Sequence, residues 1–129
     1  MKETQINLLF IGTIFAFFAV AFGAFGAHAL KDTLSEAGLH QYDLGVRYAF
    51  IHTLAIFAAG LSMPLAGKAK YLNFAAWFFI AGIVLFSGSL ILLALSQKVA
   101  FAMITPFGGF AFLLGWGFFA YGLRGGKHA

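Results

Sequence analysis

Four long stretches of this chain contain no Asp, Glu, Lys or Arg, and each is long enough to cross a lipid bilayer. They cover Ile6 to Ala27, Tyr48 to Ala66, Tyr71 to Ser96 and Val99 to Leu123, and hold 22, 19, 26 and 25 residues. The hydrocarbon core of a bilayer is about 30 Å thick and needs about 20 apolar residues in helical form. Because lipid cannot satisfy unpaired backbone amides and carbonyls, helices are the expected spanning element. The sequence therefore predicts an all-α membrane protein with four transmembrane helices.

Composition leaves little outside these spans. Of the 129 residues, 62% are hydrophobic and 9% are charged, which predicts one membrane domain over residues 1–129. The chain has no cysteine, and this excludes disulfides, thiolate metal ligands and a cysteine nucleophile. No two histidines lie three or four residues apart, so we expect no metal, no cofactor and no enzyme activity.

The basic residues indicate how the spans are oriented. With four spans, both termini and the loop between spans two and three share one side, which carries Lys2, Lys68, Lys70, Arg124 and Lys127 against Glu3. The other side carries Lys31, Arg47 and Lys98 against Asp32, Glu36 and Asp43. An excess of Lys and Arg marks the cytoplasmic side, so we expect both termini in the cytoplasm. We expect the basic tail, which includes His128, to contact lipid headgroups and not nucleic acid.

The start of the chain also has features of a signal peptide. Lys2 precedes the first apolar run, and Ala27-His28-Ala29 resembles an A-x-A cleavage site. The hydrophobic region of a signal peptide holds roughly 7 to 15 residues. The apolar run here is longer, so we interpret it as the first span.

One connection, from Lys31 to Arg47, is long and has the pattern of an amphipathic segment at the membrane interface. Thr33 and Glu36 have the spacing of a helix capping box. Gly38 can end that turn, and Asp43 with Arg47 forms an i,i+4 pair at the entry to span two. The other connections are short, which predicts antiparallel neighbours.

Small residues recur inside the spans at heptad spacing, in steps of three and four or of seven, and His52 takes one of these positions in span two. The positions are Gly12, Ala16, Ala19, Gly23 and Gly26 in span one; Gly45, His52, Ala55, Ala59, Ser62 and Ala66 around span two; Ala75, Gly82, Ser89 and Ser96 in span three; and Gly108, Ala111, Gly115 and Gly122 in span four. Helices in lipid associate by close packing of small residues. A period of 3.5 residues implies a left-handed supercoil. We therefore expect a left-handed, up-down bundle with these positions facing inward.

His52 lies on this stripe, one turn after Tyr48, and should point into the bundle. An ionisable side chain within a span marks a candidate functional site, with proton relay or substrate contact as the usual roles. The alternative is structural. In that case a neutral imidazole hydrogen-bonds to Tyr48, Ser87, Ser89 or a backbone carbonyl and fixes the register of two helices. His28, at the end of span one, is either a titrating side chain or a solvated or capping one.

Pro106 interrupts the fourth span, because proline removes a backbone donor and clashes with the preceding turn. Two outcomes remain open. Either the span kinks and Thr105 helps to satisfy the freed carbonyls, or Val99 to Ile104 forms an interfacial entry and Pro106 begins an 18-residue helix of about 27 Å. Broken helices build transporter sites, so Thr105 and Pro106 are candidate functional positions.

Several motifs in this order resemble one bacterial family. They are Gly23-Ala24-Phe25-Gly26-Ala27-His28-Ala29-Leu30, Tyr48 with His52, Leu85-Phe86-Ser87-Gly88-Ser89-Leu90, and Ile104-Thr105-Pro106-Phe107-Gly108-Gly109 with Gly115-Trp116. Together they span nearly the whole chain and resemble the family catalogued as domain of unknown function 423. The resemblance implies a four-helix inner-membrane protein with no established reaction.

Two hypotheses of function follow. The first is a non-enzymatic protein that acts by helix association, as a homo-oligomer or as an accessory subunit of a larger membrane complex, surrounded by membrane lipids. The second is a small-solute or proton channel or transporter with His52 lining the pathway. The candidate functional positions are His28, Asp43, Arg47, Tyr48, His52, Ser87, Ser89, Thr105 and Pro106.

Overall fold

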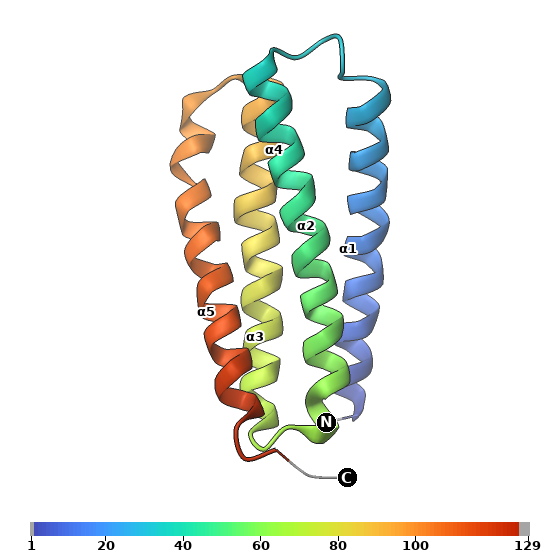
Figure 1. The fold of residues 1–129 in the computed structure, drawn as a ribbon, viewed down its shortest axis with the longest axis vertical. Coiled ribbons are helices and arrows are strands. Elements are labelled where there is room, and N and C mark those ends of the chain that lie inside the picture. Colours follow the sequence, from blue (N-terminus) through green and yellow to red (C-terminus); the bar gives the residue numbers. More distant parts are fainter. Residues whose placement is uncertain (1, 127–129) are drawn as a thin grey trace.

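Four helical spans run alternately up and down the long axis of the molecule in the computed structural model, which describes residues 2–126 (Figure 1). The first span is α1 (Lys2–His28), and the second is α2 (Glu36–Ser62) with the 3-10 turn η1 (Met63–Leu65). The third span is continuous and consists of α3 (Ala69–Gly82), the π-helical turn η2 (Ile83–Ser87) and α4 (Gly88–Ser96). The fourth span consists of the 3-10 turn η3 (Val99–Met103) followed by α5 (Thr105–Leu123). Each span is long and apolar enough to cross a membrane. The prediction of an all-α protein with four transmembrane helices is confirmed. Lys127 and His128 of the basic tail lie outside the described residues.

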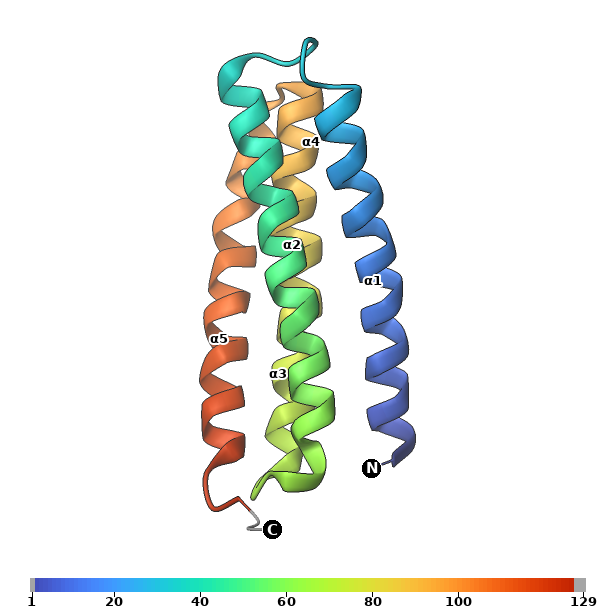
Figure 2. The same ribbon diagram turned by 45° about the vertical axis from the view of Figure 1, so that its right-hand side comes forward.

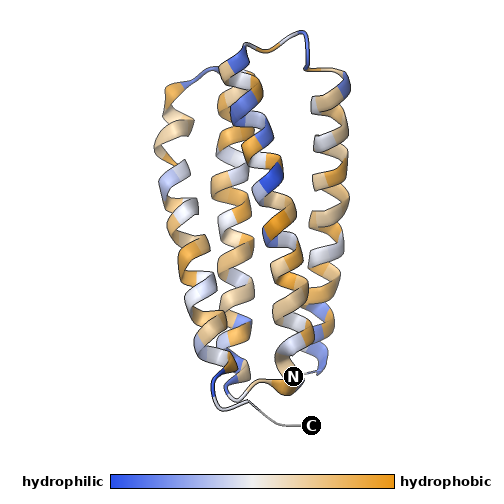
Figure 3. Ribbon diagram, viewed as in Figure 1, coloured by the Kyte–Doolittle hydropathy of each residue, from blue (hydrophilic) through white to orange (hydrophobic). Residues whose placement is uncertain are grey.

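Hydrophilic residues gather at the two ends of the molecule and along the first turns of α2 (Figure 3). Between these regions the surface is apolar and includes large side chains that no other span covers. Phe17 is 69% exposed and Leu113 is 69% exposed. A surface of this kind and extent is one that faces hydrocarbon.

Within residues 2–126, the spans form a row and not a closed ring. α2 and the third span pack against each other at the centre, while α1 packs on α2 and α5 packs mainly on the third span. Figures 1 and 2 show α1 and α5 on opposite flanks. Two hydrogen bonds tie α1 to α2: Gln5 Nε2 donates to the Gly60 carbonyl at 2.9 Å, and the Tyr42 hydroxyl donates to the Phe22 carbonyl at 2.6 Å. The left-handed twist remains a prediction.

Glycines let α5 lie directly against the third span. The facing pairs are Gly108 with Phe86, Gly115 with Phe79, and Gly122 with Leu72. A Cβ at Gly115 would lie 2.6 Å from the Phe79 ring, and one at Gly108 would overlap the Phe86 backbone. Nonbonded carbons pack at about 3.5–4.0 Å. Both helices carry these positions every seven residues, so the contact continues along the whole interface.

The predicted small-residue positions are, with one exception, buried or half-buried. Gly12 and Ala19 of α1 and Ala59 of α2 are among the buried ones, as is Ala75 of α3. The exception is Ser96, which is exposed at the end of α4, where its hydroxyl accepts the amide of the next loop. The inward orientation of the stripe is therefore confirmed for all but its last position in the third span.

The connection between α1 and α2 is shorter than predicted. α2 begins directly after Ser35, whose hydroxyl caps the helix by accepting the Gly38 amide at 3.1 Å. The prediction of a capping box at Thr33 is wrong, because the Thr33 hydroxyl donates to the Ala29 carbonyl and does not cap α2. Gly38 does not end a turn. It is buried within α2, where an added Cβ would lie 3.5 Å from Gln97. Residues 36–47 thus form the first turns of α2, and a separate amphipathic segment is not confirmed.

Pro106 lies in the first turn of α5, after the entry formed by η3. The second of the two predicted outcomes is therefore the one found. The missing proline amide costs no hydrogen bond there, because first-turn amides have no acceptor within the helix. Thr105 Oγ1 donates to the Phe101 carbonyl at 3.3 Å. The 19 residues of α5 extend about 28 Å.

Candidate functional site

His52 is buried between three spans, and both of its ring nitrogens are engaged. The residue is 3% exposed. Nδ1 lies 2.8 Å from the Tyr48 carbonyl, and Nε2 accepts the indole N–H of Trp116 at 3.0 Å. A carbonyl oxygen only accepts, and the indole only donates. The proton therefore sits on Nδ1, and the imidazole in this arrangement is neutral.

Aromatic rings enclose the His52 imidazole. Phe112 of α5 stacks on it with 3.5 Å between ring centroids, and Tyr48 and Phe79 flank it at 5.7 and 5.6 Å. The cluster joins α2, the third span and α5. This geometry favours the structural interpretation of His52, in which the imidazole fixes the register of neighbouring helices. Sequence reasoning missed the role of Trp116, which is 64 positions away along the chain.

Two predicted polar positions meet where α5 begins. Ser89 Oγ lies 2.6 Å from Thr105 Oγ1. Each hydroxyl also contacts a carbonyl in its own span, those of Phe86 and Phe101. These contacts connect the third and fourth spans next to Pro106, and they account for the polar side chains there without a ligand.

An apolar cleft of about 470 Å³ lies beside α2, between α1 and the third span. Among its lining side chains are Phe15, Phe18 and Phe22 of α1 and Val84 and Leu92 of the third span. Ser87, at the end of the π-helical turn, is 2% exposed and also lines the cleft. Within residues 2–126 its Oγ has no hydrogen-bond partner. Gly88 beside it faces open space, since the nearest atom to an added Cβ is a carbonyl oxygen at 4.0 Å. π-helical turns are frequent at functional sites.

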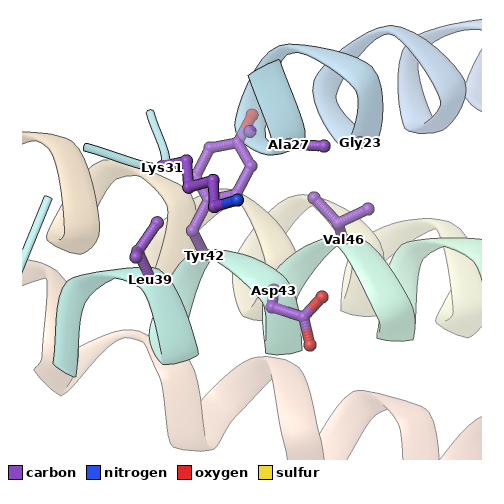
Figure 4. Close-up of a pocket in the computed structure, with 8 residues that line it drawn as sticks. Gly23, Ala27, Lys31, Leu39, Tyr42, Asp43 and Val46 are labelled. Carbon is purple, nitrogen blue, oxygen red and sulfur yellow. The ribbon is translucent and has the colours of Figure 1, made fainter. Parts of the chain in front are cut away.

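A smaller pocket of about 270 Å³ lies between the end of α1 and the start of α2 (Figure 4). Its apolar lining consists of Gly23, Gly26, Ala27, Leu39, Tyr42 and Val46. Lys31 and Asp43 supply charges of opposite sign. Asp43 Oδ2 also pairs with Arg47 at 2.5 Å on the exposed face of α2, so the predicted i,i+4 pair forms.

The candidate positions thus fall into separate groups. Tyr48 and His52 belong to the aromatic cluster, whereas His28 ends α1 with an exposed side chain. Within the part of the chain that the structure describes, no group of three or more His, Cys, Asp or Glu residues is placed to hold a metal ion.

Comparison with known proteins identifies relatives over most of the chain. Residues 22–109 match the family model described as Protein of unknown function (DUF423). A UPF0382 membrane protein of Haemophilus influenzae is 40% identical over 95% of this chain and 94% of its own length. The UPF0382 membrane protein YwdK of Bacillus subtilis is 41% identical over 84% and 88%. The UPF0382 inner membrane protein YgdD of Escherichia coli K12 is 40% identical over 88% and 86%. No solved structure shows a significant match.

Proposed function

The chain belongs to the family of membrane proteins described as Protein of unknown function (DUF423), and on that premise we propose that it acts by lateral helix association in the inner membrane, first of all with a second copy of itself. An accessory role in a larger membrane complex would use the same surface with a different partner. The proposal includes no chemical reaction. The buried imidazole of His52 is already committed to Tyr48 and Trp116.

One observation carries this proposal: α1 packs extensively on α2 alone and leaves the apolar cleft at its side. Helices in lipid associate through van der Waals contact and not through a hydrophobic drive, so an unfilled cleft between two spans is a favourable place for a further helix. In a two-fold dimer the same edge of each copy meets its equivalent. The α1 edge of one copy would then cover the cleft of the other.

Gly88 suits this surface to a partner helix. The open space at Gly88 allows a large side chain of the partner to enter. The Ser87 hydroxyl beside it is buried within the protein, so the association depends on close packing at the glycine.

The alternative function, a solute or proton pathway lined by His52, gains no support from the geometry. Phe112 covers one face of the imidazole, and both nitrogens have partners. This alternative stays a prediction. Flux through reconstituted vesicles tests it, and flux abolished by His52→Ala would favour it over helix association.

Cysteine cross-linking in native membranes tests the proposed association. The natural chain has no cysteine, so a single introduced thiol reports proximity without background. We expect Leu92→Cys, in the cleft, to form cross-linked dimers, and Leu113→Cys, on the outer face of α5, to stay monomeric. Equal cross-linking of both variants, or none of either, would contradict the proposal.

A matched pair of glycine substitutions gives a second test. Gly88→Leu fills the cleft, whereas Gly117→Leu adds the same side chain to α5, where no atom lies within 4 Å. We expect Gly88→Leu to reduce the dimer fraction measured by native mass spectrometry in lipid nanodiscs. Gly117→Leu should leave the dimer fraction unchanged.

The orientation belongs to the same proposal. Lys68, Lys70 and Arg124 lie where α3 begins and α5 ends, at the same end of the molecule as the start of α1, so we propose that this end faces the cytoplasm. A fluorescent reporter fused to the C-terminus should be active only in the cytoplasm. Activity of a periplasmic reporter at the same position would reverse the orientation.

A further inference from the structure

We propose that the pocket between the end of α1 and the start of α2 binds the headgroup of a phospholipid that carries both a phosphate and a primary ammonium, as phosphatidylethanolamine does. This pocket lies at the end of α1, whereas the cleft of the proposed association lies farther back along α1, and Val46 lines both. The depth, the charges and the shape of the pocket support this assignment.

The depth of the pocket places it among lipid headgroups. The 27 residues of α1 extend about 40 Å, whereas the hydrocarbon core is about 30 Å thick, so the last turns of α1 reach the headgroup layer. Gly23 and Ala27 lie in these last turns, and Lys31 follows the end of the helix. A molecule in this pocket therefore has its polar part at the interface and its chains directed into the bilayer.

The charges of the pocket complement a zwitterion. Lys31 comes from the connection after α1 and Asp43 from α2, and both line the pocket. Figure 4 shows the Lys31 side chain over the space between the two helices and the Asp43 carboxylate at its outer margin, on the side of α2 that faces away from α1. The one ion pair within residues 2–126 joins Asp43 Oδ2 to Arg47, which leaves the Lys31 ammonium and Asp43 Oδ1 without an ionic partner. Lys31 can bind a phosphate oxygen, and Asp43 can accept N–H donors from a primary ammonium. A quaternary ammonium has no N–H to donate, and a glycerol headgroup has no cation.

The size of the pocket suits a headgroup whose chains stay in the bilayer. Its volume of about 270 Å³ is below the roughly 300–1,000 Å³ of sites that bury a whole drug-sized ligand. Gly26 lets the buried Tyr42 ring lie directly against α1, and this ring forms part of the pocket wall. The Tyr42 hydroxyl is already used by the Phe22 carbonyl, so the ring offers an apolar surface. Val46 extends this surface towards the hydrocarbon.

Native mass spectrometry of delipidated protein tests the proposal, with phosphatidylethanolamine, phosphatidylcholine and phosphatidylglycerol of identical chains added back. We expect the wild type to bind phosphatidylethanolamine most tightly. Lys31→Gln and Asp43→Asn should each lower that affinity about three- to fivefold, the effect of losing one accessible ion pair. The controls Lys98→Gln and Asp32→Asn change exposed charges at the same end, outside the pocket, and should have no effect. Arg47→Gln should preserve the preference, because it removes the ion pair but keeps the carboxylate.

Three results would overturn the proposal. One is equal binding of the three lipids by the wild type, and another is an equal loss in the two control variants. The third is loss of the preference in Arg47→Gln, because it would show that Asp43 acts through the Arg47 pair and not through the lipid ammonium. Helical content measured in parallel by circular dichroism identifies any variant that unfolds. The variant Ala27→Phe fills the pocket without changing a charge, and it should also weaken phosphatidylethanolamine binding.

Discussion

Replacing Gly108 by alanine places a methyl group against the Phe86 backbone, where α5 lies very close to the third span. A backbone segment cannot rotate away as a side chain can, so the two helices must separate to admit the methyl group. Overpacking of this kind typically costs about 1–3 kcal/mol. Alanine also gains about 0.5–1 kcal/mol over glycine within a helix, which hides part of that cost.

Gly117→Ala is the matched control for this measurement. Gly117 lies on the same helix, and no atom falls within 4 Å of the position that its Cβ would take. Both variants gain helix propensity, so the difference between them isolates the packing cost. We expect Gly108→Ala to be less stable than Gly117→Ala by about 1–3 kcal/mol, which is a factor of about 5 to 150 in the unfolding equilibrium.

Unfolding in mixed micelles measures this difference. The purified variants are titrated with sodium dodecyl sulfate, and helical content is followed by circular dichroism. Gly108→Ala should unfold at a lower detergent fraction than wild type, and Gly117→Ala at the same or a higher fraction. Equal midpoints for the two variants would refute the close contact between α5 and the third span.

Three further predictions concern single hydrogen bonds. Trp116→Phe leaves His52 Nε2 without its hydrogen-bond donor in a buried site, so we expect the free energy of unfolding to fall by about 0.6–2 kcal/mol in the same assay. An unchanged midpoint would contradict the hydrogen bond between Trp116 and His52. Ser35→Ala removes the cap of α2 and should lower the free energy of unfolding by about 1 kcal/mol, whereas Thr33→Ala should lower it by less. A larger loss for Thr33→Ala would instead support the capping box at Thr33. Tyr42→Phe removes one of the two bonds that tie α1 to α2, so amide hydrogen exchange should rise in α1 and stay constant in α5.

Much of the architecture could be predicted because membrane insertion imposes strong local rules. A long stretch without charges must be helical in lipid, so the four spans follow from composition alone. The inward position of small residues follows from their heptad spacing, as Gly115 and Ala59 illustrate. The start of α2 could not be placed in this way. Thr33 and Ser35 are both suitable caps, and only the structure shows that the Ser35 hydroxyl accepts the Gly38 amide.

The burial of His52 was predicted from the sequence, whereas its contacts with other spans were not. His52 is buried as expected, but its partner Trp116 lies on another span, and no local pattern pairs the two. Ser89 and Thr105 were singled out separately, and their hydrogen bond appears only when the fourth span folds back on the third. Contacts across helices depend on the rotation of each helix about its axis, which the sequence constrains weakly.

The sequence by itself determined the element type, the number of spans and the face that each span turns inward, because these depend on transfer into lipid and on helical periodicity. The tertiary structure decided which spans touch. It placed α1 on one flank with α2 as its main neighbour, left the cleft at Ser87 and Gly88 open, and brought Lys31 and Asp43 to one pocket. The physical reason is that packing in lipid has no general hydrophobic drive, so the shapes of particular side chains select the arrangement of the helices.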